Sequence, residues 1–322
     1  MCPFYTLNNY FLLKRRVVLK TEVIKAKARK IFYSNEMVGY VFAFPFIFGF
    51  ICFSLIPIIT SLRYAFTDFS MGNKTIELVG FANFKQLLGD EIFLKSLGIT
   101  LKYVFISVPL KLIFALLVAF VLTRKTKMQV LYRSLYYVPS LVGGSIAVAL
   151  VWKQLFARKG LFNSVLADMG LGTINWFGDQ KLALYPLILM SVWQFGSSMI
   201  IFAAGLKEIS PTYYEAARID GANTFQSFVN ITLPCLSPII LYNLVMQTIQ
   251  AFMSFTQAFV ITAGGPDNGT MMYALYVYNQ AFKYNHMGYA CAMSWFMLIV
   301  MCIITLVIFK TSKSWVFTES GD

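Results

Sequence analysis

Long apolar runs separated by short polar segments form the main pattern of the chain. Each run has about twenty residues, the length that an α-helix needs to cross roughly 30 Å of hydrocarbon. The pattern therefore predicts an all-α integral membrane protein with six transmembrane helices. We place them at about residues 38–62, 96–122, 131–152, 182–206, 236–263 and 287–310, with 1–37 as a basic N-terminal tail, 38–310 as the membrane domain and 311–322 as a short C-terminal tail.

The polar segment between the fourth and fifth runs, Lys207–Pro238, is called the polar loop here. Ser210 followed by Pro211 predicts a helix start, because Ser can cap free N–H groups and Pro is tolerated at the first helical position. Gly221 predicts the end of that helix in left-handed geometry. A second short helix is expected to follow, with one apolar stripe formed by Phe225, Phe228 and Val229. Residues 231–234 are expected to close the polar loop.

Seven residues of the polar loop resemble the EAA motif of permease subunits in binding-protein-dependent ABC importers. They are Glu215-Ala216-Ala217, Gly221 six residues after the Glu, Ile231 ten residues after that Gly, and Leu233-Pro234. The resemblance implies a cytoplasmic coupling helix that docks into a groove on a separate ATP-binding subunit. The residues that it assigns to this coupling are Glu215, Ala216, Ala217, Asp220, Gly221, Phe225 and Phe228. An ordinary amphipathic loop between two spans is the alternative.

A second motif, Thr262-Ala263-Gly264-Gly265-Pro266 with Thr270 shortly after, is similar to a signature of carbohydrate permeases of the maltose and glycerol-phosphate type. The resemblance runs from about residue 37 to the C-terminus. It implies a second, homologous permease subunit, two cytoplasmic ATP-binding subunits, an extracytoplasmic binding protein and a carbohydrate substrate. ATP and Mg²⁺ would bind the ATP-binding subunits, and no cofactor would bind this chain. Import of another solute, such as a glycerol phosphate derivative, is the alternative.

Composition and charge agree with a membrane protein. The chain is 58% hydrophobic and 13% charged, with mean hydropathy +0.66, which is too apolar for a soluble domain of 322 residues. Eight basic residues precede the first run, where anionic lipid would attract them, so the net charge of +13 does not indicate nucleic acid. Sixteen Lys and Arg residues flank the runs on the side of the polar loop and nine on the other side. This asymmetry predicts that the polar loop and both termini lie in the cytoplasm. The family resemblance implies that the membrane is a bacterial plasma membrane.

The chemistry of an enzyme is not visible in the sequence. All acidic residues lie outside the predicted spans and His286, the sole His, is near the outer edge, so a proton-coupled carrier or a membrane enzyme acting on lipid-linked sugars is not favoured. The segment 72–75, Gly-Asn-Lys-Thr, lacks the upstream glycine of a phosphate-binding loop. We therefore expect that ATP hydrolysis takes place on separate subunits.

Polar side chains within the fifth run predict a substrate path. The five members, spaced 4, 3, 4 and 3 residues apart on one helical face, are Asn243, Gln247, Gln250, Ser254 and Gln257. Amides both donate and accept hydrogen bonds and therefore suit carbohydrate hydroxyls, although such stripes also hold helices together. Phe252, Phe255 and Phe259 are expected on the opposite face, toward lipid or packing. The fourth run adds Trp193, Gln194 and Ser198, and Trp193 could stack on a sugar ring.

Lys111 lies near the centre of the second run. It shares a helical face with Ser107, Ala115 and Ala119, which indicates that it faces protein rather than lipid. A backbone carbonyl partner is one interpretation. The other is that Lys111 attracts an anionic substrate, such as a uronic-acid oligosaccharide or a glycerol phosphodiester.

Overall fold

The computed structural model describes residues 35–73, 75–123 and 129–317. Most of the predicted N-terminal tail and the end of the C-terminal tail lie outside these residues. The described chain is helical, with one isolated antiparallel bridge between Thr67 and Leu78, so the all-α class is confirmed. The chain divides into two compact units, Met1–Arg63 and Tyr64–Asp322.

The first predicted span belongs mainly to the first unit. It consists of α2 (Asn35–Phe50), the π-helical turn η1 (Ile51–Leu55) and α3 (Ile56–Tyr64). Together they give a candidate membrane span at Gly39–Tyr64 with mean hydropathy 2.4. A helix that is apolar on all sides requires lipid or another protein around it.

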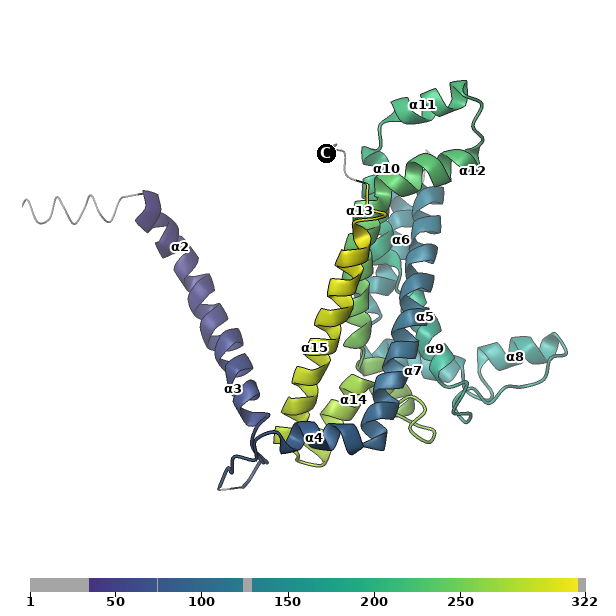
Figure 1. Ribbon diagram of the computed structural model, residues 1–322. Helices are drawn as coiled ribbons and strands as arrows, with labels where there is room; N and C mark the ends of the chain where they lie inside the picture. The colour runs from purple at the N-terminus through teal and green to yellow at the C-terminus, as the bar shows by residue number, and fades with distance from the viewer. Residues whose placement is uncertain (1–34, 74, 124–128, 318–322) are drawn as a thin grey trace, which may run out of the picture. The chain divides into compact units, whose positions relative to one another are not determined.

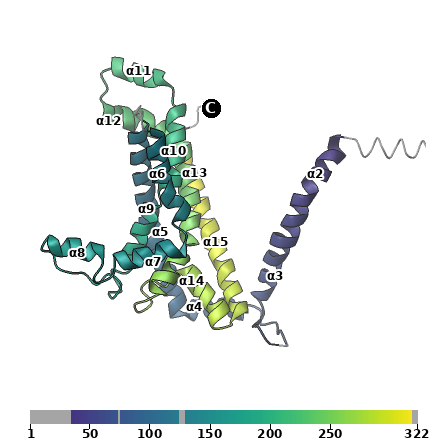
Figure 2. The ribbon, with the colours of Figure 1, turned by 180° about the vertical axis from the view of Figure 1, so that it is seen from behind.

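The second unit is organised around α5 (Glu91–Leu122), which packs against α9 (Leu184–Trp193), α10 (Gly196–Glu208) and α13 (Leu233–Phe252). Small residues allow close packing of these helices. Ala115 and Ala119 of α5 are fully buried, and a side chain at Gly205 of α10 would collide with Ile239 of α13. The polar loop lies at one end of this bundle, with α11 (Pro211–Ile219) and α12 (Thr224–Ser227) (Figures 1 and 2).

The opposite end of the bundle, called the far end here, carries the shorter elements. They are α4 (Ala82–Gly89), α14 (Tyr273–Tyr278), the π-helical turn η4 (Asn279–Lys283) and the start of α15 (Met287–Ser312). In both views α8 (Leu161–Asp168) projects from the side of the bundle (Figures 1 and 2).

The third span is not the straight helix that we expected at 131–152. Helices α6 (Gln129–Val142) and α7 (Ile146–Leu155) meet at an angle of 100°. Gly143 and Gly144 weaken the helix between them, and Ser145 caps α7 by accepting a hydrogen bond from the Val148 N–H at 3.3 Å. When this bent pair is taken as one span, the described residues hold the six predicted spans.

The fourth span is interrupted at Gln194 and Phe195, which separate α9 from α10. The hydroxyl of Ser140, on α6, lies across the interruption. It donates a hydrogen bond to the Gln194 carbonyl at 3.1 Å and accepts one from the Ser197 N–H at 3.0 Å. Irregular backbone at membrane depth requires such partners, because no water is available there.

The fifth span differs from the predicted 236–263 at both ends. It starts at Thr224 and runs through α12, the π-helical turn η2 (Phe228–Thr232) and α13 without interruption. Leu233 and Pro234 therefore do not close the polar loop, because a proline is tolerated in the first turn of α13. The regular helix ends at Phe252, and after an irregular stretch the chain forms the π-helical turn η3 (Ala258–Thr262).

Candidate functional site

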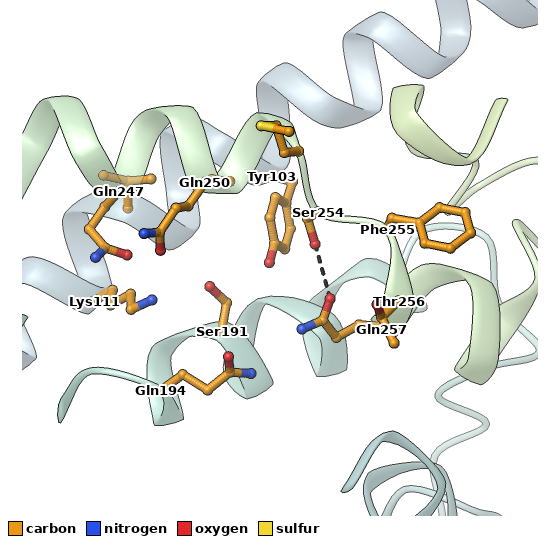
Figure 3. A pocket seen from close by; sticks show the side chains of 13 residues that line it. Tyr103, Lys111, Ser191, Gln194, Gln247, Gln250, Ser254, Phe255, Thr256 and Gln257 are labelled. Carbon is orange, nitrogen blue, oxygen red and sulfur yellow. Dashed lines mark hydrogen bonds between the residues drawn. The ribbon is translucent and has the colours of Figure 1, made fainter. Parts of the chain in front are cut away.

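A polar cavity of about 230 Å³ lies where the fourth and fifth spans are irregular. Helices α5, α9 and α13 and the segment after α13 supply its walls, and Figure 3 shows polar side chains from these elements around a common space. The polar members are Tyr103, Lys111, Ser191, Gln194, Gln247, Gln250, Ser254, Thr256 and Gln257. The space is thus surrounded mainly by hydroxyls, amides and one ammonium group.

The structure places four of the five predicted stripe residues on the polar cavity: Gln247, Gln250, Ser254 and Gln257. The reason differs from the expected one, since the helix ends at Phe252 and the irregular residues 253–255 direct Ser254 and Gln257 to the same space. The Ser254 hydroxyl donates a hydrogen bond to Gln257 Oε1 at 3.2 Å (Figure 3).

Asn243, the remaining stripe residue, does not line the polar cavity. Its side chain is 1% exposed, and Nδ2 donates to the carbonyl of Ile239 at 3.1 Å. Oδ1 has no hydrogen-bond partner among the described residues. Asn243 precedes Gln247 by one helical turn and therefore lies nearer the polar loop.

The predicted cluster of the fourth span is divided by the structure. Gln194 lines the polar cavity, and its Nε2 donates to the carbonyls of Gly143 at 3.3 Å and Met190 at 3.2 Å. Trp193 instead lines a separate apolar cavity of about 760 Å³, with its ring 5.6 Å from that of Trp152. Ser198 is fully buried, and its hydroxyl has no partner among the described residues. Trp193 is thus not placed to stack on a ligand in the polar cavity.

Sequence reasoning missed Tyr103, Ser191 and Thr256. Tyr103 precedes Lys111 by eight residues and so falls on the same helical face, a signal that could have identified it. Phe255 was expected to face away from the stripe, and Figure 3 shows its ring turned away from the polar side chains; the ring stacks on that of Phe259 at 5.1 Å. Phe252 is buried and packs in the core, whereas Phe259 is 41% exposed and faces outward. Both agree with the expectation that these rings face lipid or pack.

Lys111 is 9% exposed and lines the polar cavity. Figure 3 shows its ammonium group on the same side of the space as the amides of Gln247 and Gln250. Within the described part of the chain, these three side chains form no hydrogen bond and Lys111 forms no ion pair. The carbonyl partner that we considered for Lys111 is therefore not found among the described residues.

The polar loop has the expected helix–turn–helix structure. Ser210 caps α11 and also contacts Thr212, and Gly221 has φ +79°, the left-handed geometry that favours glycine. Asn223 and Gln226 form a reciprocal capping box at the start of α12, with hydrogen bonds of 2.9 and 2.8 Å. Of the predicted coupling residues, Glu215, Ala216 and Asp220 are exposed and Ala217 is half-buried.

The two predicted aromatic residues of the polar loop have different surroundings. Phe228 packs edge-to-face on Phe120 of α5, with ring centroids 5.1 Å apart. Phe225 is 74% exposed. The hydroxyl of Tyr214 on α11 lies 2.9 Å from that of Thr232, which is fully buried at the end of η2. The loop is thus held against the bundle by Phe228 and Tyr214, while Phe225 remains free to contact another protein.

Hydrogen bonds hold the loop that follows η3 in a fixed shape. The Thr270 hydroxyl lies 2.7 Å from the Thr262 hydroxyl and 2.7 Å from the Gly265 carbonyl, and its one proton is shared between these two acceptors. Lys95 of α5 donates to the Asp267 carbonyl at 2.6 Å and lies 3.5 Å from its carboxylate. The two threonines of the second motif thus fasten this loop.

Asp90 connects the far ends of three helical segments. Its Oδ2 accepts hydrogen bonds from the hydroxyls of Tyr276 at 2.6 Å and Tyr289 at 2.7 Å, and its Oδ1 accepts from the first N–H groups of α5. Burial raises the pKa of the Asp90 carboxyl, but these hydrogen bonds outweigh burial and bring the pKa below its ordinary value of 3.8. Among the described residues, no three His, Cys, Asp or Glu side chains gather to form a metal site.

Comparison with known proteins agrees with this arrangement. Residues 93–312 match the family described as "Binding-protein-dependent transport system inner membrane component". The chain is 49% identical to the probable ABC transporter permease protein YesP of Bacillus subtilis, over 89% of this chain and 94% of that protein. It is 32% identical to the arabinooligosaccharides transport system permease protein AraP of Bacillus subtilis, over 89% of this chain and 92% of that protein.

A solved structure shares the fold. It is a chain of a bacterial ABC transporter involved in the import of the acidic polysaccharide alginate, with a TM-score of 0.75 and 22% sequence identity, covering 91% of this chain and 98% of that chain. At this identity the similarity establishes the architecture of the helices and not the ligand.

Proposed function

Because the chain belongs to the family of binding-protein-dependent transport system inner membrane components, as a multi-pass permease of an ABC sugar transporter, we propose that it moves an oligosaccharide into the cell through the polar cavity. An extracytoplasmic binding protein would deliver the sugar. Two cytoplasmic subunits that bind ATP and Mg²⁺ would drive the cycle, and a second, homologous permease subunit would complete the pathway. Both termini and the polar loop would lie in the cytoplasm.

The observation that carries this proposal is the chemistry of the polar cavity. It lies within a bundle of membrane spans, and its amides and hydroxyls can both donate and accept hydrogen bonds, as sugar hydroxyls do. The amides of Gln247 and Gln250 are uncommitted to any described residue, so they are available to a ligand.

Two buried polar atoms extend the pathway toward the polar loop. Ser198 and Asn243 each lie one helical turn from a cavity residue, on the side nearer the polar loop, and each has an oxygen without a hydrogen-bond partner among the described residues. Unsatisfied buried polar groups are costly and commonly mark a functional role. We infer that these oxygens become exposed to the sugar when the bundle opens toward the cytoplasm.

The polar loop would couple this opening to ATP. The uninterrupted helix from Thr224 to Phe252 begins in the polar loop and carries Gln247 and Gln250 near its other end. A displacement of the loop by the ATP-binding subunits would therefore move the cavity wall directly. Glu215, Ala216, Asp220 and Phe225 are exposed and suited to contact those subunits, with the half-buried Ala217 beside them, whereas Gly221 sets the turn of the loop through its positive φ.

Relatives of the chain support a sugar as the substrate class. Their names include transport systems for arabinooligosaccharides, trehalose and maltose, and lactose. Import of a different solute, such as a glycerol phosphate derivative, is the second candidate, since one cationic side chain lines the polar cavity.

Uptake by the reconstituted transporter tests the proposal. The chain would be purified with its partner permease and ATP-binding subunits, placed in liposomes, and supplied with the binding protein and labelled oligosaccharides. We expect uptake that requires both ATP and the binding protein, and that falls at least about tenfold in a Gln247→Leu, Gln250→Leu double variant. Full uptake without ATP, or full uptake by that variant, would contradict the proposal.

A further inference from the structure

We propose that the polar cavity selects a saccharide that carries a carboxylate, and that the ammonium group of Lys111 binds this carboxylate. This inference rests on the proposed import function and specifies the substrate class of the same site. It follows from three properties of the cavity, which are the burial of Lys111, the absence of a counter-charge in the described chain, and the chemistry of its neighbours.

Burial is the first property. Lys111 lies in the interior of the long span Glu91–Leu122, and its side chain is 9% exposed, so it is not directed toward lipid or bulk water. A buried charge is strongly unfavourable unless a partner compensates it. Lys111 lines the polar cavity. Within the described part of the chain, a compensating partner could therefore reach it from this cavity alone.

The second property is the absence of a counter-charge. Of the described residues, Lys95 and Asp267 form the one ion pair, and that pair lies at the far end of the bundle. Asp90, the N-cap of the helix that carries Lys111, accepts hydrogen bonds from Tyr276 and Tyr289 and lies about six turns away. No acidic side chain lines the polar cavity. The compensating anion must therefore come from the ligand or from the partner permease.

The chemistry of the neighbours is the third property. An ammonium group supplies three donors and no acceptor, whereas each amide supplies both. Lys111 thus suits a carboxylate, and the uncommitted amides of Gln247 and Gln250 suit hydroxyls on the same ligand. A neutral sugar would satisfy the amides but would leave the charge of Lys111 uncompensated. One positive charge together with hydroxyl-binding groups fits a uronic acid unit.

Transport by charge variants tests this inference. Liposomes that contain the complete transporter would be given, in parallel, a neutral oligosaccharide, a uronic-acid oligosaccharide of the same length, and a glycerol phosphodiester, each with binding protein and ATP. We expect the wild type to prefer the uronic-acid oligosaccharide. Lys111→Gln should lower uptake of the uronic-acid oligosaccharide at least about tenfold more than uptake of the neutral oligosaccharide, and Lys111→Arg should retain most of the uronic-acid uptake.

Lys102 supplies a matched control. It is on the same helix, carries the same charge, lies 5.5 Å from the ring centre of Tyr185, and does not line the polar cavity. Lys102→Gln should therefore transport the uronic-acid oligosaccharide at the wild-type rate. Copurification of Lys111→Gln with its partner subunits establishes that the variant assembles.

The outcomes separate this inference from the import function. Uptake of the neutral oligosaccharide alone, or an equal effect of Lys111→Gln on neutral and acidic sugars, would overturn carboxylate selection while leaving sugar import intact. If the wild-type transporter preferred the glycerol phosphodiester to the uronic-acid oligosaccharide, the proposal that Lys111 selects a carboxylate would be wrong. If none of the three compounds is taken up in an ATP-dependent manner, the proposed function itself is contradicted.

Discussion

The hydroxyl groups of Tyr214 and Thr232 lie 2.9 Å apart, although 18 residues separate them in the sequence. Tyr214 belongs to α11 and Thr232 to the π-helical turn that continues into α13. The hydrogen bond therefore joins the first helix of the polar loop directly to the helix that carries Gln247 and Gln250. A force on α11 reaches that helix through this bond as well as through the backbone.

Loss of the Tyr214 hydroxyl should weaken coupling. Tyr214→Phe removes one partly buried hydrogen bond, worth about 1 kcal/mol, while keeping the ring. We expect a severalfold decrease in the number of sugar molecules imported per ATP hydrolysed, measured in the same liposomes. Tyr213→Phe is the matched control, because Tyr213 is exposed and its hydroxyl has no hydrogen bond within the described residues. An unchanged ratio in Tyr214→Phe would show that the bond does not transmit the movement.

Gly221 should be sensitive to side-chain type through its backbone alone. Its φ is +79°, and a Cβ there would meet no atom within 4 Å, so a substitution costs backbone strain of about 1–2 kcal/mol and no collision. We expect Gly221→Val to reduce uptake strongly and Gly221→Asn, which tolerates this geometry, to reduce it less. Gly98→Ala, equally open but with ordinary φ, should transport normally. Equal losses in the Val and Asn variants would point to side-chain volume instead.

Phe225 and Phe228 should differ in what their removal affects. Phe228→Ala loses the contact with Phe120 and should lower the free energy of unfolding by about 1–3 kcal/mol, less than for a fully buried Phe. Phe225→Ala removes an exposed side chain and should change stability by less than about 0.5 kcal/mol. It should nevertheless weaken binding of the ATP-binding subunits, measured by copurification. Normal binding by Phe225→Ala would exclude this ring from the interface.

Asp90 should stabilise the far end over the whole neutral pH range. Because its pKa is lowered, the stabilisation is complete above the ordinary value of 3.8 and is lost only as the pH falls through the lowered pKa. Asp90→Asn should reduce the free energy of unfolding by about 1–2 kcal/mol, a figure discounted for the partial exposure of the carboxyl. This difference should stay constant between about pH 5 and pH 8 in thermal unfolding. If the stability difference between wild type and Asp90→Asn varied with pH in this range, the lowered pKa of Asp90 would be contradicted. Glu91→Gln, which changes an exposed neighbouring carboxylate, serves as the control.

The length of the apolar runs was sufficient to predict the spans, because crossing a bilayer sets a minimum helix length. The interruptions at 143–145, 194–195 and 253–255 could not be predicted in this way, since a broken helix and a continuous one have the same hydropathy. Each interruption depends on tertiary contacts. The hydroxyl of Ser140, for instance, is 54 residues from the carbonyl that it satisfies.

The candidate site was predicted only in part, because the helix interruptions could not be predicted. Helical spacing correctly grouped Gln247 and Gln250, which precede the end of α13. Beyond Phe252 the spacing no longer describes the chain, so Thr256 was not considered. The polar loop was easier to predict, because its caps and its glycine act through residues only a few positions apart.

The bridge made by Ser140 limits how the bundle can rearrange. One hydroxyl satisfies both a carbonyl and an N–H at the interruption of the fourth span, and these two backbone groups would be left without partners in an apolar environment if α6 slid along α10. Gly196 adds to this constraint, because it allows α10 to approach the backbone of α6 closely. Helices α6, α9 and α10 should therefore rotate as one rigid body during transport, which leaves α13 and α5 as the surfaces against which that body turns.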